Sequence, residues 1–304
     1  INTMRMEREE LEAHLSRQIA DIKDINESNT RLKGVMEQQL IDQKDSIGKV
    51  YTITQTLEQH MPDEVMFYAV EVLMNLMHTK DVALYNVVNQ DYARIFSASS
   101  VKARSLGNSI RYREMTGVYE DLAEEKVYIN KTMDPRYPLM ARAIYENGDI
   151  KMIIMLWGLS WEKMTLGQAN FLTVISYLIQ NAVLRAQRYI QALEEKRYSE
   201  EGGRILREDA FKPLAEAYME AKEKNLAECV FLKIDAAPER YRQIEQTMTK
   251  KMRDSDYLGL LPDGRLYVLL TNTTKESAGI VQERFEQNGY STEIVEKIAV
   301  CPEE

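Results

Sequence analysis

The sequence predicts a mixed α/β chain of the α+β type, in which a long N-terminal helix precedes two domains that each contain a β-sheet. Three observations support this fold class. Apolar residues recur at heptad spacing near the N-terminus, which is typical of a coiled coil. The middle of the chain alternates helical and strand-like patterns around a hairpin turn. The last third shows the order β-α-β-β-α-β, which is typical of a ferredoxin-like core. We therefore divide the chain into residues 1–60, 61–200 and 201–304.

Length and charge limit the function classes. The 304 residues are enough for two ordinary domains and an extension. The formal net charge of -9 argues against non-specific binding to nucleic acids, so we expect no DNA or RNA partner. Cys229 and Cys301 have no metal-binding or disulfide spacing, which fits a reducing cytoplasm. No apolar run reaches the roughly 18 residues that span a bilayer. Because the first residue is Ile1, we expect a fragment of a longer protein.

Residues 1–60 are predicted to form a coiled-coil stalk. The apolar residues at the a and d positions of its heptads are Leu11, Leu15, Ile22, Ile25, Leu32, Met36, Val50, Ile53 and Leu57. Asn29 at an a position favours a parallel dimer in register, so we expect a homodimer. Gln39 and Gln43 weaken the contact surface between the helices. The alternative is one long amphipathic helix that packs on its own domain.

Residues 61–200 are predicted to contain a sheet flanked by two helices. The predicted elements are a helix from Pro62, strands over 82–88, 93–98 and 127–130, paired segments over 139–145 and 150–159, and a long helix from Thr165 to about Tyr198. Asn147-Gly148 between the paired segments is a strong hairpin signal. From Pro62 to Arg188 this order resembles a GAF domain. The resemblance implies a domain that often binds a small molecule against its sheet, but no convergent set of polar residues identifies one here.

Residues 201–304 are predicted to form the second domain, which begins near Arg204 after the break at Gly202-Gly203. The predicted elements are helix 212–222, strand 229–235, helix 238–252, a hairpin around residues 262–264, helix 275–288 and strand 292–298. Pro262 followed by Asp263-Gly264 favours a tight turn between the two apolar segments.

Arg253 and Asp256 form an Arg-x-x-Asp pair that begins nine positions before Pro262, and Arg284 follows in the next predicted helix. This spacing resembles the inhibitory site of GGDEF domains, the fold of diguanylate cyclases. The resemblance implies that Arg253, Asp256 and Arg284 bind cyclic di-GMP, with Arg185 and Arg188 as additional contacts from the first domain or a partner protomer.

The chemistry of these residue types suits the ligand. A planar guanidinium can donate two hydrogen bonds to guanine O6 and N7, and it also pairs with phosphodiester anions. A carboxylate can accept hydrogen bonds from guanine N1–H and N2–H. Taken alone, an Arg-x-x-Asp pair is more often an ordinary surface pair on a helix, which contributes little.

The catalytic half of the GGDEF pattern is missing. Residues 262–266 replace the Gly-Gly-Asp/Glu-Glu-Phe hairpin, and Lys233 stands where the family has its first metal-binding aspartate, so only Asp235 of that pair remains. Pro262 lacks a backbone amide hydrogen, and Arg265 places a positive charge where a carboxylate is needed. Phosphoryl transfer depends on metal ions that neutralise developing charge. We therefore expect no enzyme activity, no bound metal and no cofactor.

Taken together, a stalk, a GAF domain and a degenerate GGDEF domain resemble the PelD family of cyclic-di-GMP receptors. That resemblance implies the cytoplasmic portion of an inner-membrane protein that acts with membrane-associated Pel synthase components in exopolysaccharide and biofilm formation. Two alternatives remain open. One is a dimeric GAF and coiled-coil signalling scaffold that binds no nucleotide, and the other is a residual diguanylate cyclase.

Overall fold

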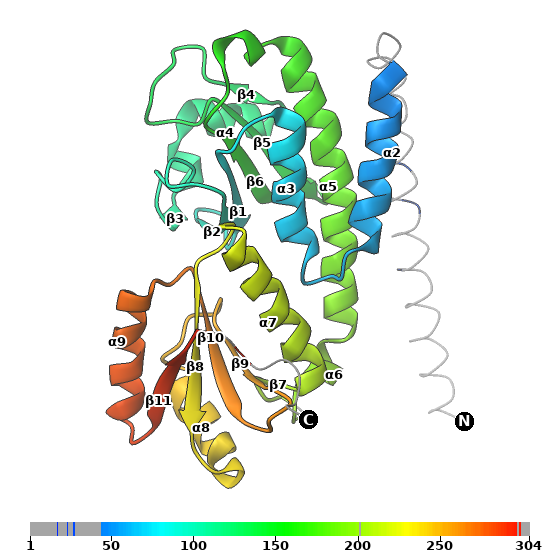
Figure 1. Cartoon of the computed structure of the whole chain (residues 1–304). Helices are drawn as coiled ribbons and strands as arrows, with labels where there is room; N and C mark the ends of the chain where they lie inside the picture. The colour runs from blue at the N-terminus through cyan, green and yellow to red at the C-terminus, as the bar shows by residue number, and fades with distance from the viewer. Residues whose placement is uncertain are drawn as a thin grey trace, which may run out of the picture.

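The computed structural model describes residues 44–200, 202–296 and 298, together with residues 17, 23 and 27. These residues form two sheet-containing domains, one below the other in Figure 1, with helices α2, α3 and α5 beside the upper sheet. Within the described residues, none of the helices combines the length and the apolar character that crossing a bilayer requires.

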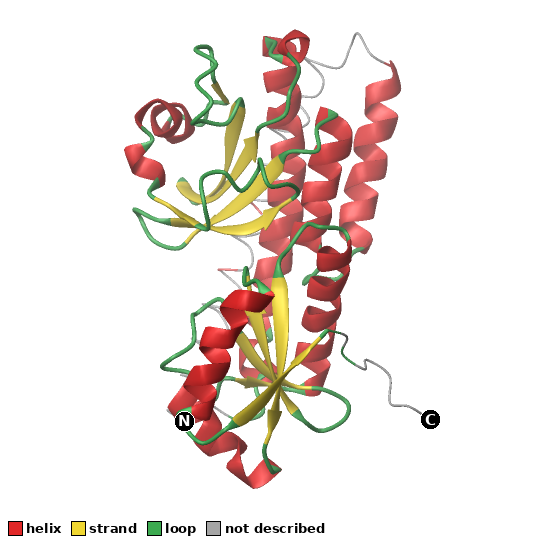
Figure 2. Cartoon of the chain, turned by 60° about the vertical axis from the view of Figure 1, so that its left-hand side comes forward, coloured by secondary structure: helices red, strands yellow, loops and turns green. Residues whose placement is uncertain are grey.

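The first domain contains a six-stranded antiparallel sheet in the order β3-β2-β1-β6-β5-β4. Its strands are β1 (Val82–Val87), β2 (Ala93–Ala98), β3 (Ser109–Ile110), β4 (Tyr128–Ile129), β5 (Met140–Glu146) and β6 (Asp149–Leu156). Its helices are α2 (Lys44–Gln59), α3 (Val65–Met77), α4 (Thr116–Ala123), α5 (Leu166–Ala192) and α6 (Glu194–Arg197), with 3-10 turns at Tyr112–Glu114 and Trp161–Lys163. Figure 2 shows the long helices on one side of this sheet and the short helix with its loops on the other.

The hairpin between β5 and β6 forms where the sequence predicts it. Glu146 pairs with Asp149, and the two residues between them, Asn147 and Gly148, have φ angles of 53° and 85°. Two successive left-handed residues match the right-handed twist of the flanking strands, which is why Asn-Gly is favoured there. The prediction of this turn is confirmed.

The predicted start of one helix needs correction, and the predicted extent of the other agrees with the structure. Helix α3 begins at Val65, because Pro62 to Glu64 form a preceding turn in which the Met61 amide donates to Glu64 Oε2 at 3.3 Å. Helix α5 does start after Thr165, whose hydroxyl accepts from Gln168 N at 3.2 Å. The helical path ends at Arg197, because Tyr198 turns extended to pair with Leu206.

Helix α2 packs on its own domain. Val50 and Leu57 are buried in the core that α3 and α5 also form, and Ile53 packs against it. At Val50, Ile53 and Leu57 the structure therefore has the alternative arrangement, an amphipathic helix that packs on its own domain. The apolar side of α2 contacts α3 and α5. The heptad positions between Leu11 and Gln43 lie outside the described residues.

The second domain contains a five-stranded sheet in the order β11-β8-β10-β9-β7. Its elements are β7 (Ile205–Leu206), α7 (Glu208–Glu223), β8 (Cys229–Asp235), a 3-10 turn (Pro238–Arg240), α8 (Tyr241–Met248), β9 (Tyr257–Leu260), β10 (Leu266–Thr271), α9 (Lys275–Glu286) and β11 (Ser291–Val295). From β8 onward the order is β-α-β-β-α-β, as expected. Gly264, with φ of 70°, closes the predicted turn between β9 and β10.

The two domains share side-chain packing and ion pairs. The ring of Phe67 on α3 lies 4.7 Å from that of Phe96 on β2 and 5.0 Å from that of Tyr218 on α7. Lys224, just after α7, pairs with Glu71 of α3 at 2.7 Å. These contacts bury apolar surface from both domains in one core, so we treat the pair as a single packed unit.

Candidate functional site

The predicted Arg-x-x-Asp pair lies in a turn between α8 and β9. Helix α8 ends at Met248, and the Asp256 amide donates to the Arg253 carbonyl at 3.0 Å. Arg253 is exposed and Asp256 is half-buried. The two residues are therefore neighbours across a turn and do not share a helix face, as an ordinary surface pair would.

The Asp256 carboxylate fastens this turn to the sheet. Its Oδ2 accepts from the Arg253 amide at 3.2 Å, and its Oδ1 accepts from the Thr271 amide at the end of β10 at 3.1 Å. Burial raises the pKa of this carboxyl group, while the amides of Thr271 and Arg253 and the guanidinium groups of Arg253 and Arg94 oppose the rise. Asp256 thus has a fixed position and orientation.

Arg284 reaches the same turn from α9. Its Nη1 donates to the Lys251 carbonyl at 3.3 Å, two residues before Arg253. Lys251 in turn donates through Nζ to Asn288 Oδ1 at 2.7 Å, which ties the turn to the end of α9. The structure therefore brings Arg253, Asp256 and Arg284 to one segment of the second domain.

Arg185 and Arg188 do not reach this segment within one chain. On α5, Arg185 pairs with Glu58 of α2 at 3.1 Å, and Arg188 lies 3.7 Å from Glu146 of β5. Both pairs tie helix α5 to other parts of the first domain. Their contact with a ligand held at Arg253 stays a prediction that requires a partner protomer or a rearrangement.

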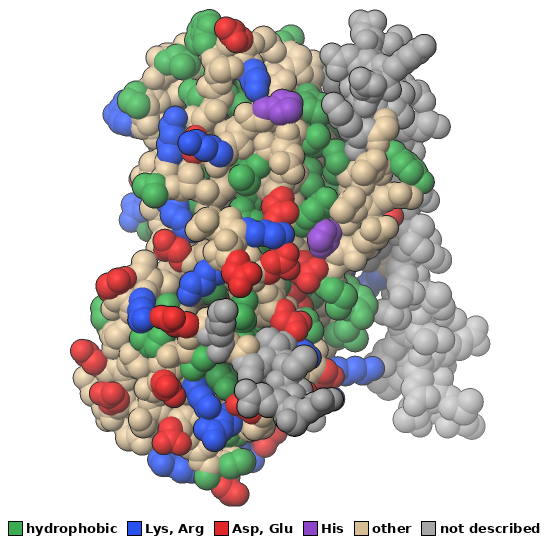
Figure 3. Space-filling view, in the orientation of Figure 1, with side chains coloured by type: hydrophobic (Ala, Val, Ile, Leu, Met, Phe, Trp, Pro, Cys, Tyr) green, Lys and Arg blue, Asp and Glu red, His purple; other side chains and the backbone are tan. Residues whose placement is uncertain are grey.

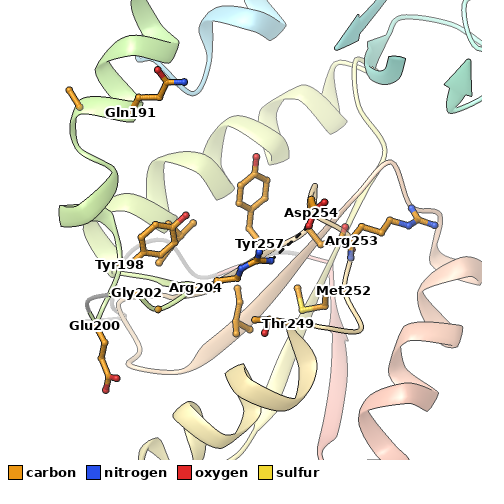
Figure 4. A pocket seen from close by; sticks show the side chains of 15 residues that line it. Gln191, Tyr198, Glu200, Gly202, Arg204, Thr249, Met252, Arg253, Asp254 and Tyr257 are labelled. Atoms are coloured by element: carbon orange, nitrogen blue, oxygen red, sulfur yellow. Dashed lines mark hydrogen bonds and ion pairs between the residues drawn. The ribbon is translucent and has the colours of Figure 1, made fainter. Parts of the chain in front are cut away.

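An open cavity of about 790 Å³ lies between the turn and the connector, residues 193–204, which joins α5 to β7. Figure 4 shows its lining: Gln191 and Tyr198 come from the connector side, whereas Asp254 and Tyr257 come from the turn and β9. In that view the Arg253 side chain points away from Tyr198 and Tyr257. This volume is typical of small-molecule sites.

Arg204 is a cavity residue that sequence reasoning missed. Its Nη1 lies 3.9 Å from Asp254 Oδ1, the pair drawn as a dashed line in Figure 4. Its amide donates to Glu245 Oε1, which also accepts from the Ile205 amide at 3.0 Å. The sequence places Arg204 just after the Gly-Gly break, but only the pairing of β7 with β9 brings this part of the chain close to Asp254.

The hairpin between β9 and β10 is closed by its own contacts. Asp263 accepts from the Tyr267 hydroxyl at 2.7 Å and from the Arg265 amide at 3.0 Å. Lys233 lies on β8 opposite Tyr267 of β10 and Glu293 of β11. Among the described residues, no group of three histidine, cysteine or acidic side chains is arranged to hold a metal ion.

Charge on the molecular surface is mixed. On the face shown in Figure 3, acidic and basic side chains are interspersed over the second domain. An anionic ligand that approaches this face therefore meets no continuous basic surface, and its recognition depends on individual arginines.

The fold was compared with known proteins. No protein-family model matches the chain, and no curated protein matches it. Solved structures that resemble it include a PelD fragment from Pseudomonas aeruginosa, with 13% identity, a TM-score of 0.37, and coverage of 82% of this chain and 89% of that one. A PelD fragment from the same species in complex with c-di-GMP has 12% identity, a TM-score of 0.36, and coverage of 82% and 88%.

The GAF domain of an Acinetobacter phosphoenolpyruvate-protein phosphotransferase has 9% identity and a TM-score of 0.38, and the match covers 48% of this chain and 96% of that one. The identities and TM-scores of these similar structures are low, so no property of those proteins is carried over to this chain here. The mixed α+β fold with two sheets is established by the strand pairings of the chain itself.

Proposed function

We propose that this chain is a non-catalytic receptor for cyclic di-GMP, which it binds at the turn that carries Arg253 and Asp256. The observation that carries the proposal is the convergence of three side chains on that turn. Arg253 and Asp256 belong to it, and Arg284 donates to its Lys251 carbonyl at 3.3 Å. Two exposed guanidinium groups beside a fixed carboxylate suit a ligand that has guanine edges and phosphodiester anions.

The bonds that Asp256 already makes are compatible with this role. An ionised carboxylate has about four acceptor positions, and the amides of Arg253 and Thr271 use one on each oxygen. The remaining positions can accept from guanine N1–H and N2–H. Since the backbone bonds hold the carboxylate in place, little conformational freedom is lost when the ligand binds.

The proposal assigns no catalysis to the second domain, which it describes as a degenerate GGDEF domain with a ferredoxin-like core. Lys233 would repel the cations that phosphoryl transfer requires. The hydrogen bonds that Asp263 accepts from Tyr267 and Arg265 hold the β9–β10 turn in a fixed conformation. Binding would therefore act as a signal without a chemical step.

In the wider proposal, the chain lies on the cytoplasmic side of the inner membrane, forms a homodimer through its N-terminal coiled coil, and activates membrane-associated Pel exopolysaccharide synthesis when it binds the dinucleotide. One of the similar solved structures is PelD in complex with c-di-GMP. The assignment of that ligand to this chain rests on Arg253, Asp256 and Arg284 and on their shared position.

A panel of nucleotides tests the proposal. A ligand that binds only the folded state raises the melting temperature. We expect a rise with cyclic di-GMP and none with cyclic di-AMP, because adenine lacks the O6 acceptor and the N1–H and N2–H donors. GTP incubated with the protein should yield no cyclic dinucleotide by chromatography. Equal shifts with both dinucleotides would contradict guanine recognition, and product formation would support the residual cyclase instead.

A further inference from the structure

We infer that Arg204 is a phosphate-binding residue of the cyclic-di-GMP site, and that in the free protein its guanidinium is weakly paired with Asp254. The inference rests on the proposed function and deepens it. It adds to the site a residue from the start of the second domain, on the wall opposite the turn that carries Arg253.

The first support is the position of Arg204 in the cavity. Arg204 and residues 252–254 line the same space of about 790 Å³, so the connector and the turn form its two walls. A dinucleotide bound at the turn has two phosphodiester groups to accommodate. In Figure 4 the Arg204 guanidinium extends beneath Tyr257 towards the turn, whereas that of Arg253 points outward. Arg204 is therefore the better placed of the two to meet a phosphate inside the cavity.

The second support is that the backbone of Arg204 is fixed by hydrogen bonds while its side chain is exposed. The amides of Arg204 and Ile205 both donate to Glu245 Oε1 on α8, the helix that leads into the turn. The Arg204 side chain is 62% exposed. The Arg204 backbone thus has a fixed position relative to α8 and the turn that follows it, while the guanidinium can change partners.

The third support is the weakness of the present partner. The closest approach of Arg204 to Asp254 is 3.9 Å, and the Asp254 side chain is 90% exposed. An exposed pair at this distance contributes little, because water screens both charges. A phosphodiester oxygen in the cavity can form a shorter charge-assisted hydrogen bond and displace the carboxylate.

The aromatic lining offers a place for the rest of the ligand. Tyr198 on the connector and Tyr257 on β9 both line the cavity together with Arg204. A purine that enters beside Arg204 would meet a tyrosine ring on which it can stack. The cavity therefore combines an exposed cation, Arg204, with aromatic side chains, and both can contact a nucleotide.

Calorimetric titration with cyclic di-GMP over a range of salt concentrations tests the inference. We expect Arg204→Ala to weaken binding by about tenfold, as loss of a charged hydrogen bond does. The slope of log Kd against log salt should also fall by about one unit, which a purely structural effect would not cause. Arg204→Lys should lie between Ala and the parent, because it keeps the charge without the planar fork.

Arg207→Ala is the matched control. Arg207 follows three residues later, is similarly exposed, and pairs with Asp209 at 3.3 Å outside the cavity lining. It should bind like the parent protein. Asp254→Asn should tighten binding by about twofold to fivefold by releasing Arg204. That gain should shrink when Arg204→Ala is also present.

The outcomes separate this inference from the proposed function. If Arg253→Ala abolishes binding while Arg204→Ala stays within about twofold of the parent at every salt concentration, the dinucleotide site stands and the role of Arg204 is overturned. If the parent protein does not bind cyclic di-GMP, both are overturned. A tenfold loss with an unchanged salt slope would also overturn the phosphate contact.

Discussion

Asp63 and Arg197 form an ion pair that joins the turn before α3 to the last residue of α6, with Arg197 Nη2 3.6 Å from Asp63 Oδ1. The side chains are only 13% and 17% exposed, respectively. Burial raises the pKa of Asp63, and the charge of Arg197 opposes that rise. The pair lies near Tyr257, so it links the first domain to one wall of the candidate site.

Removal of Arg197 should destabilise the protein. In Arg197→Ala the Asp63 carboxylate stays buried without its counter-charge, so we expect the free energy of unfolding to fall by about 2–3 kcal/mol in urea titration at neutral pH. Arg207→Ala removes an exposed pair from the same region and should change it by less than about 0.5 kcal/mol. Equal effects from both variants would contradict a special role for the Asp63 pair.

The loss of stability caused by Arg197→Ala should depend on pH. Without Arg197, the pKa of Asp63 rises further above its ordinary value of 3.8. The folded state then binds the Asp63 proton more tightly than the unfolded state, so stability falls as pH rises from 3.8 through the folded value. The difference between variant and parent should shrink as pH is lowered from about 7 towards 4. A difference that stays constant over this range would contradict the explanation.

The two domains should unfold together. Phe67 lies between Phe96 and Tyr218, and Phe67→Ala should lower the free energy of unfolding by about 3–5 kcal/mol. Both tryptophans, Trp157 and Trp161, belong to the first domain and report on it by fluorescence. The fluorescence transition of the parent should coincide with that seen by far-ultraviolet circular dichroism, which reports on both domains. Separate transitions would show that the shared core does not couple them.

Cys229 should be unreactive until the second domain opens. It is buried at the start of β8, and burial raises the pKa of its thiol to about 11. At about pH 8 only about 0.1% of such a thiol is ionised, and the thiolate is the reactive form. In a Cys301→Ser background we expect no reaction with a thiol reagent in native buffer and full reaction in denaturant. Rapid native reaction would contradict the packing of β8 against α7.

Gly259 on β9 should not tolerate a side chain. A Cβ atom there would lie 2.2 Å from Cγ of the buried Phe211, whereas one at Gly279 on α9 would meet nothing within 4 Å. Gly259→Ala should therefore destabilise the fold by about 1–3 kcal/mol or more. Gly279→Ala should be neutral or stabilise it by up to about 1 kcal/mol, because alanine favours helix. Thermal melts of the two variants would distinguish them.

Local chemistry allowed several parts of the fold to be predicted. Asn147-Gly148 specifies its turn because both residues tolerate left-handed backbone, and Thr165 specifies a helix start because its hydroxyl can cap the first turn. The packing partner of α2 was not predictable, since an apolar stripe at heptad spacing can pack equally well against a second copy of the chain or against a neighbouring helix. Only the position of α3 and α5 decides where Val50 and Leu57 are buried.

In the candidate site, too, some features could be predicted from the sequence and others only from the fold. The spacing of Arg253, Asp256 and Arg284 is a property of the sequence, and the structure brings them to one turn. The bond from the Thr271 amide to Asp256 and the place of Arg204 depend on strand pairings between distant segments. No local pattern encodes such pairings, so these features had to come from the fold.

Calorimetric titration of cyclic di-GMP into the parent protein, Arg253→Ala and Arg265→Ala tests the central claim most directly. Arg253 lies in the proposed site, and Arg265 is an exposed arginine in the β9–β10 turn, outside that site. We expect micromolar binding by the parent and by Arg265→Ala, and a loss of about 2–3 kcal/mol of binding free energy in Arg253→Ala. A folded parent protein that releases no heat with the dinucleotide, or an Arg253→Ala variant that binds as tightly as the parent, would contradict the claim.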